Sequence, residues 1–231
     1  MKTLKTLLLF AAVCCISFVL PSCLNDDNDF SLGKYQLEIV SVKSAGNAPY
    51  FRADDGTTLW PAAGYVDLSR LGEGQRVWLN MTLLGDSTMG AQHFDYYIRV
   101  NQVDTVLTKR LAPDLGADND AVYGTDPVEI RSMRTGNGHL TIRFAAKFGD
   151  EKKHWVNLVK NDRIEDETYP IHLEFRHNAQ GDPQLSTQEG WVCFDLGDLP
   201  TPYTKTVDLI VKVITPDGPK EYKINYNPND K

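Results

Sequence analysis

Apolar and polar residues alternate along short stretches of this chain, and no long stretch repeats at the helical period. The stretches 35–42 and 75–83 alternate cleanly, as half-buried β-strands do. A longer stretch, 94–111, changes phase near Asn101, which predicts a bulge or a bend in a strand. The pattern therefore predicts an all-β protein.

A polar segment at 112–120 shows no periodicity and divides the chain into two predicted domains. Before it, a few short strands favour a small OB-like β-barrel, which we place at 34–118. After it, seven alternating stretches favour an antiparallel β-sandwich, which we place at 119–231. These stretches are 128–133, 140–148, 155–160, 171–177, 190–196, 204–215 and 221–226.

The N-terminus has the three zones of a secretory signal peptide: a basic start, an apolar run, and Leu20-Pro21-Ser22 before Cys23. The apolar run is shorter than the ~20 residues that a membrane-spanning helix needs. The ending resembles a lipobox, so we expect residues 1–22 to be removed and Cys23 to carry lipid. The acidic residues in 23–33 predict an extended tether, and they also resemble the export signal of surface lipoproteins in Bacteroides-type bacteria.

The predicted location is the outer membrane, with the body at the cell surface or otherwise on the periplasmic side. The full chain has a formal net charge of −7, and removal of the basic signal peptide makes the mature chain more acidic. Nucleic acid and anionic lipid repel such a body, so we expect no nucleic-acid partner and membrane attachment through Cys23 alone. Cys193 is then the one unmodified cysteine, which excludes an internal disulfide, and we expect it in the core.

Several motifs, each a turn that leads into a strand, follow one another in a distinctive order. They are the lipobox with its acidic tail and the segments 54–61, 72–78, 103–109, 126–128, 138–144 and 154–159. Together they cover essentially the whole chain, which resembles the NigD-like lipoproteins of Bacteroidota. The resemblance implies an N-terminal OB domain followed by a β-sandwich domain. It also implies a link to bacteriocin immunity, which is suggested for the founding member, and it supplies no catalytic residues.

The sequence holds no pattern typical of a catalytic or metal-binding site. It lacks a Gly-x-Ser-x-Gly elbow, and Asp118-Asn119-Asp120 lacks the register of a calcium loop. The acidic run Glu165-Asp166-Glu167 is expected to be a solvated loop rather than a glycosidase pair. The histidines lack zinc-site spacing and are expected at the surface or at strand ends: His93, His139, His154, His172 and His177. We therefore predict no metal, no cofactor and no enzyme activity.

Aromatic residues crowd the first domain and give the clearest functional signal. Asp54-Asp55-Gly56 predicts a hairpin turn, because Asp-Gly pairs suit tight turns. Side chains alternate across a strand, so Phe51, Leu59 and Trp60 cannot all face one core. At least one of Leu59 and Trp60 should point outward. Packing in the core or against the second domain is the simpler explanation for each ring, and the candidate ligand-binding residues are Phe51, Trp60 and Tyr65.

These observations favour a non-catalytic cell-envelope lipoprotein that binds a protein or a glycan partner. A bacteriocin immunity protein is the alternative that the resemblance implies. An uncharacterised hydrolase and a purely architectural envelope subunit are further alternatives. A cleft of convergent polar groups would favour the hydrolase, an aromatic patch would favour the binding protein, and a bare sheet edge would favour the architectural subunit.

Overall fold

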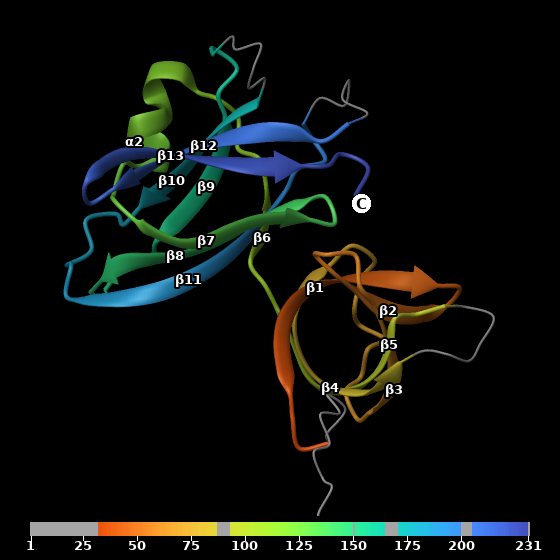
Figure 1. Ribbon diagram of the computed structural model, residues 1–231. Coiled ribbons are helices and arrows are strands. Elements are labelled where there is room, and N and C mark those ends of the chain that lie inside the picture. The colour runs from red at the N-terminus through yellow and green to blue at the C-terminus, as the bar shows by residue number, and fades with distance from the viewer. Residues whose placement is uncertain (1–31, 87–92, 150, 165–170, 200–204, 231) are drawn as a thin grey trace, which may run out of the picture.

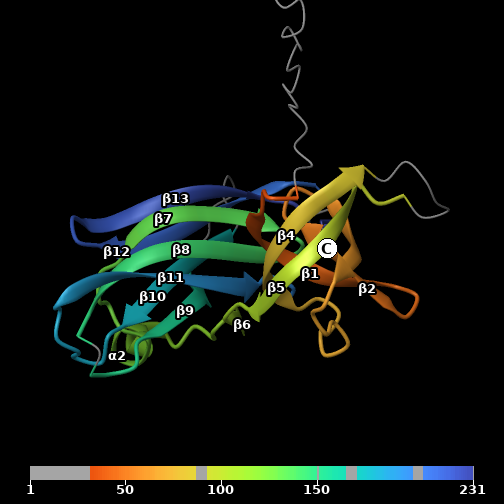
Figure 2. The same ribbon diagram turned by 90° about the horizontal axis from the view of Figure 1, so that it is seen from below.

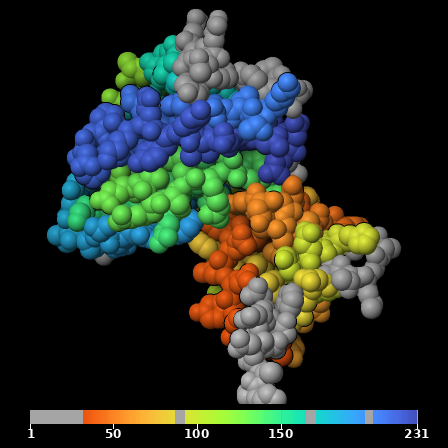
Figure 3. All heavy atoms as spheres, in the orientation of Figure 1, coloured from red at the N-terminus to blue at the C-terminus, as the bar shows by residue number. Residues whose placement is uncertain are grey.

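The computed structural model describes residues 32–86, 93–149, 151–164, 171–199 and 205–230. Two β domains lie one above the other, with the chain passing from the first to the second at a narrow junction (Figure 1). A space-filling view shows the first strands of the barrel in direct contact with the sandwich (Figure 3). Among the described residues, no helix is long and apolar enough to cross a membrane.

The first domain is a closed barrel with the strand order β1-β2-β3-β5-β4. A parallel pairing of β3 with β5 closes the barrel, and the other strand pairings of this domain are antiparallel. Alternate side chains of each strand point inward, so the predicted period of two fills one core. The strands are β1 (Gln36–Ala45), β2 (Ala48–Ala53), β3 (Thr58–Gly64), β4 (Arg76–Asp86) and β5 (Tyr96–Thr105).

A bulge in β5 explains the phase change that the sequence shows near Asn101. Asn80 of β4 pairs with Gln102, whereas the next residue, Met81, pairs with Val100. Asn101 is therefore the extra residue of the bulge. The bulge keeps apolar side chains on the inside of the barrel on both sides of the break.

The second domain is a sandwich of two four-stranded sheets in the described part of the chain, with the orders β13-β12-β10-β9 and β6-β11-β8-β7. Figure 2 shows the sheets stacked as layers beside the barrel. Phe144, Phe175 and Phe194 pack edge to face between them. The strands are β6 (Thr108–Arg110), β7 (Glu129–Gly136), β8 (His139–Phe148), β9 (Trp155–Lys160), β10 (Ile171–Asn178), β11 (Ser186–Asp195), β12 (Val207–Thr215) and β13 (Gly218–Tyr226).

The sandwich differs in two respects from the sequence prediction. Two pairings, β10 with β12 and β6 with β11, are parallel, because the intervening chain crosses to the other sheet before it returns. The second domain also begins earlier than residue 119, since β6 already pairs with β11.

The polar segment at 112–120 is part of the sandwich domain. It contains the 3-10 helix η1 (Gly116–Asp118) and runs into the short helix α2 (Asn119–Tyr123). The Asp114 carboxylate accepts hydrogen bonds from the Gly116 backbone N–H and the Asn119 amide. Its polar composition therefore reflects internal hydrogen bonds rather than a flexible linker.

An apolar cluster joins the two domains. Ile39 and Val106 of the barrel pack with Cys193 of the sandwich, and Cys193 is a buried free cysteine, as the sequence predicts. Trp78 and Trp191 meet edge to face beside them, with ring centroids 4.9 Å apart. Separation of the domains would expose this surface to water, which is unfavourable.

A buried ion-pair network crosses the same junction. The guanidinium of Arg76, on the barrel, is fully buried and lies 2.7 Å from Oδ1 of Asp54, as an ion pair rather than an aligned hydrogen bond. Arg134 of the sandwich donates from Nε to Oδ2 of Asp54 at 2.8 Å. Arg76 also donates to Ser41 of the barrel and to Thr141 of the sandwich. A charge removed from water is tolerated only with such partners, so the network requires both domains in place.

We expect Arg76→Met to lower the free energy of unfolding by about 3–5 kcal/mol, because it leaves the buried Asp54 carboxylate paired with Arg134 alone. Urea denaturation of the purified protein measures the change. The matched control is Arg70→Ala, which removes a surface pair with Asp67 whose side chains are 90% and 65% exposed. That pair should contribute less than about 1 kcal/mol. Equal midpoints for the two variants would show that the network is not important for stability.

We expect Gly136→Ala to destabilise the protein by about 1–3 kcal/mol through overpacking at the junction. A Cβ atom at Gly136 would lie 2.4 Å from Cβ of Asp54, which is closer than real carbon contacts allow. Gly72→Ala is the control, because the nearest atom to its added Cβ is 3.9 Å away. Thermal melting of both variants tests this, and an unchanged melting temperature for Gly136→Ala would contradict the close approach.

Candidate functional site

The predicted hairpin places one of its aromatic side chains outside the barrel. Asp54-Asp55-Gly56 turns the chain between β2 and β3, and Phe51 pairs with Leu59 across the hairpin. Phe51 and Leu59 are 0% and 1% exposed, so both lie inside. Trp60, the next residue, therefore points outward and is partly exposed.

Three aromatic side chains lie together on this outer face, with the ring of Phe94 in tilted contact with the other two, and we call Tyr50, Trp60 and Phe94 the aromatic surface. The rings of Trp60 and Phe94 are 4.7 Å apart between centroids, and those of Tyr50 and Phe94 are 5.1 Å apart. All three are partly exposed, in strands β2 and β3 and just before β5. Ring faces of this kind offer a rigid apolar platform with little entropy to lose on binding.

A fixed carboxylate lies at the edge of the aromatic surface. Asp95, next to Phe94, accepts hydrogen bonds from the backbone N–H and the hydroxyl of Thr58, each at 2.7 Å. These hydrogen bonds, the backbone one first, lower the pKa of Asp95 below its usual value. Asp95 is therefore ionised at neutral pH and adds a hydrogen-bond acceptor beside the rings.

The three candidate residues from the sequence do not form one site. Phe51 is a core residue of the barrel, so its predicted place in a binding surface is corrected: the alternation of β2 turns its ring inward, opposite Leu59. Tyr65 follows the end of β3 and is fully exposed. Trp60 alone takes part in the aromatic surface. Cys23, most of the predicted tether and the acidic residues 165–167 lie outside the described residues.

The sequence pattern placed Phe94 and Asp95 at the start of the predicted strand 94–111 and gave neither a role in binding, whereas β5 begins at Tyr96. Both precede β5, and neither belongs to a strand whose alternation would orient it. Their contacts are made with Tyr50, Trp60 and Thr58, which are distant in sequence. The one available signal was the aromatic ring directly after a polar segment.

The aromatic surface offers rings and one carboxylate, which can hold a ligand by stacking and hydrogen bonding. The free thiol of Cys193 is buried at the domain junction and is remote from solvent. Among the described residues, no group of three or more His, Cys, Asp or Glu side chains is arranged to hold a metal ion. The chemistry that this surface supports is recognition.

Comparison with known proteins places the two domains in one family. The model of the NigD-like N-terminal OB domain matches residues 39–106, and that of the NigD-like C-terminal β-sandwich domain matches residues 110–226. None of the curated proteins is similar in sequence to this chain.

Several solved structures share the fold. A putative toxin-related protein from Parabacteroides distasonis is 39% identical, with a TM-score of 0.72, and the match covers 85% of this chain and 96% of that one. A protein of unknown function from Bacteroides vulgatus is 28% identical, with a TM-score of 0.70 and coverage of 86% and 94%. A NigD-like immunity protein from Bacteroides caccae is 18% identical, with a TM-score of 0.64 and coverage of 84% and 97%. At that identity, the similarity shows a shared fold and nothing about function.

The family models match the barrel and the sandwich in the order in which the chain holds them, and both the predicted resemblance and the predicted fold class are confirmed. The chain therefore belongs to the NigD-like family, with an N-terminal OB domain and a C-terminal β-sandwich domain.

Proposed function

We propose that this chain is a non-catalytic, lipid-anchored protein of the bacterial outer membrane that binds a protein or glycan partner through the aromatic surface. The observation that carries the proposal is the group of tilted rings formed by Tyr50, Trp60 and Phe94 on the outside of the barrel, with the ionised Asp95 at its edge. Aromatic rings that remain partly exposed in a well-packed domain favour a binding role.

The topology of β1 supports a defined orientation at the membrane. Gln36, at the start of β1, pairs with Met81, whereas Ser41 pairs with Arg76 at the domain junction. The chain thus enters the barrel at the end that lies away from the sandwich. Even fully extended, the segment between Cys23 and Gln36 spans at most about 45 Å. A lipid on Cys23 would hold the barrel near the bilayer and the sandwich farther out.

Binding is proposed rather than catalysis because of the groups that the aromatic surface presents. Rings and a single fixed carboxylate can orient a ligand, whereas hydrolysis needs a second acid or base, a nucleophile or a metal. A glycan fits ring stacking with an adjacent acceptor, and a protein partner fits the same surface through its apolar side chains.

Bacteriocin immunity is the second candidate function. It is favoured by the relative from Parabacteroides distasonis, which is 39% identical and is described as a putative toxin-related protein. In that case, the partner at the aromatic surface would be a toxin. Protection of sensitive cells by expression of this chain, lost in Trp60→Ala, would distinguish immunity from glycan binding.

We expect Trp60→Ala to lower the affinity for the partner at least about tenfold, since a buried interface tryptophan typically contributes 2 kcal/mol or more. Glycan arrays, followed by calorimetry with each bound glycan, provide the measurement. Trp155→Ala is the control, because Trp155 is a 44% exposed tryptophan of the sandwich and lies on another domain. Equal loss of binding in both variants, or none in either, would refute a role for the aromatic surface.

We expect mass spectrometry of the mature protein to find an N-terminal, acylated Cys23, because the lipobox directs both cleavage and lipid attachment. Cys23→Ala should move the protein from the membrane fraction to the soluble fraction. A mature N-terminus at another residue, or a Cys23→Ala variant that stays in the membrane fraction, would overturn the anchor.

A further inference from the structure

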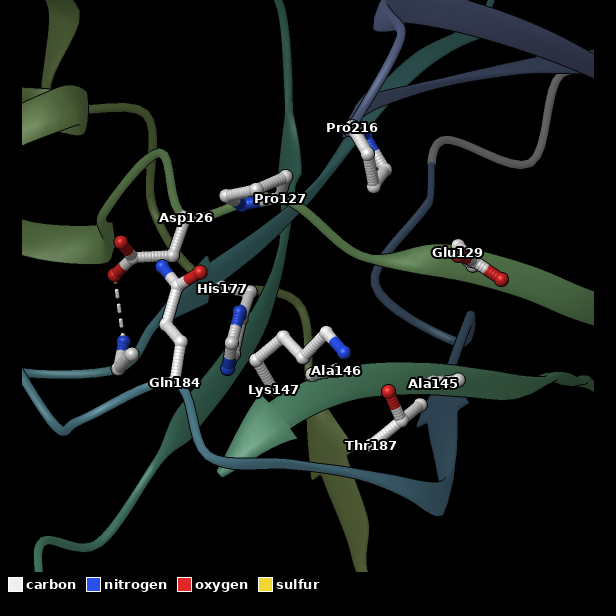
Figure 4. Close-up of a pocket in the computed structure, with 11 residues that line it drawn as sticks. Asp126, Pro127, Glu129, Ala145, Ala146, Lys147, His177, Gln184, Thr187 and Pro216 are labelled. Carbon is white, nitrogen blue, oxygen red and sulfur yellow. Dashed lines mark hydrogen bonds between the residues drawn. The ribbon is translucent and has the colours of Figure 1, made fainter. Parts of the chain in front are cut away.

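A cleft of about 150 Å³ between the two sheets of the sandwich lies beside a histidine that the fold already engages. Figure 4 shows the imidazole of His177 at one side of the cleft, between the side chains of Gln184 and Lys147. The sequence predicts His177 and His154 at the surface or at strand ends. His177 does lie near the end of β10, but its ring turns inward, against Phe144 and His154. Only 3% of His177 and 5% of the His154 side chain are exposed, which corrects the predicted surface position.

The two histidines belong to a buried chain of hydrogen bonds. Oδ2 of Asp182 lies 3.2 Å from Nε2 of His154, and Nδ1 of His154 lies 2.8 Å from Nε2 of His177. His177 also interacts with the backbone of Asp126, and Oδ2 of Asp126 accepts the Ala179 N–H at 2.7 Å. These groups satisfy one another inside the sandwich, so they indicate no ligand.

The barrel, by contrast, has an apolar outer face that is only partly covered. Ile39 and Leu37 of β1, and Tyr35 directly before it, alternate with the inward-facing Val40 and so share this face. Ile39 is 0% exposed, because it packs with Cys193 of the sandwich, whereas Leu37 is 59% and Tyr35 is 70% exposed. The sandwich thus covers the face near the domain junction and leaves its other end open.

A further apolar side chain extends this open end. Leu32 is 63% exposed, and its backbone carbonyl accepts a hydrogen bond from the Arg99 guanidinium at 3.2 Å, which ties the segment to the barrel. We call Leu32, Lys34, Tyr35 and Leu37 the entry surface. Single exposed apolar residues are ordinary, but three large ones within six consecutive residues form a patch.

The entry surface lies where the chain arrives from the predicted lipid anchor. Figure 1 shows the chain entering at the end of the barrel that lies away from the sandwich. Leu32 follows Cys23 by nine residues, which span at most about 32 Å even when fully extended. A lipid on Cys23 would keep the entry surface within that distance of the bilayer. Such a short connection gives an effective concentration in the millimolar range, so a weak contact would be populated.

We propose that the entry surface inserts into the headgroup region of the bilayer that holds the lipid of Cys23. This inference rests on the proposed lipid anchor and adds a second membrane contact, which would fix the orientation of the barrel. Interfacial side chains reach about 5–10 Å into this region. Leu32 and Tyr35 would be inserted, whereas Leu37 lies about 7 Å farther along the strand from Tyr35 and would mark the edge of the contact.

The chemistry of the entry surface suits this environment. Tyrosine is enriched at membrane interfaces, where its ring is apolar and its hydroxyl stays among the headgroups. Lys34 is exposed beside Tyr35, and a lysine can bury its stem while its ammonium group stays at the level of the phosphates. Gln36 and Leu83 line the same shallow hollow as Tyr35.

The charge of the protein indicates which lipids would be contacted. The chain is acidic as a whole, so attraction to anionic lipid does not support the contact. The contact then depends on burial of apolar side chains and should be strongest on zwitterionic lipid. The sequence predicts attachment through Cys23 alone, and a patch of this size would add to that anchor without replacing it. A protein partner could cover the same side chains, but the short connection to Cys23 places the bilayer within reach.

The test measures hydrogen exchange of the full mature chain on vesicles of phosphatidylethanolamine and phosphatidylcholine. The chain is attached through Cys23, either by its natural lipid or by coupling of the unacylated thiol to a maleimide lipid. Cys193 is buried and would not react. The reference is the same chain coupled to a soluble maleimide. We expect the amides of 32–37 to exchange at least about threefold more slowly on the vesicles, and those of 183–187 in the sandwich to be unchanged.

Variants separate contact by the entry surface from an effect of the attachment itself. Leu32→Ser combined with Tyr35→Ser should abolish the protection of 32–37, and Lys34→Glu should reduce it. Leu185→Ser is the matched control, because Leu185 is a 75% exposed leucine of the sandwich. It should leave the protection intact. All of these side chains are exposed, so the variants should keep the melting temperature of the native protein.

Two results would overturn the proposal: equal exchange of 32–37 on vesicles and in solution, or protection that persists in the double variant. Protection of 183–187 in place of 32–37 would also overturn it, because the sandwich would then face the bilayer. A cell-made protein without lipid on Cys23 would instead contradict the anchor in the proposed function. The maleimide-coupled chain would still decide whether the entry surface contacts the bilayer, so the two failures are distinguishable.

Discussion

The arrangement of this protein depends on one buried charge, the guanidinium of Arg76 at the junction of the two domains. Arg76 is 1% exposed and belongs to the barrel, yet its partners include Thr141 of the sandwich and Asp54, which Arg134 of the sandwich also holds. An isolated buried arginine would cost several kcal/mol in lost hydration. The two domains must therefore stay together to keep that charge paired. Burial of the apolar cluster around Trp78 and Trp191 stabilises the same arrangement of the domains.

Much of the fold follows from local sequence pattern. Alternation in 75–83 predicts β4, and its inward residues Val77, Leu79 and Met81 do fill the barrel core. The phase change near Asn101 predicts the bulge in β5. The early start of the sandwich domain could not be predicted, because β6 is three residues long and is a strand only through its pairing with β11. The same holds for the parallel pairs, which depend on the route of the chain between sheets.

The candidate sites show the same division between local and long-range information. Alternation was enough to predict that at least one of Leu59 and Trp60 points outward, and the structure shows that it is Trp60, because Leu59 faces the core. It could not show that the ring of Phe94 contacts those of Tyr50 and Trp60. The chain from Asp182 through His154 to His177 was beyond sequence reasoning altogether, since its members come from separate segments and carry no characteristic spacing. A histidine with no motif around it can still be buried and hydrogen-bonded when the fold supplies its hydrogen-bond partners.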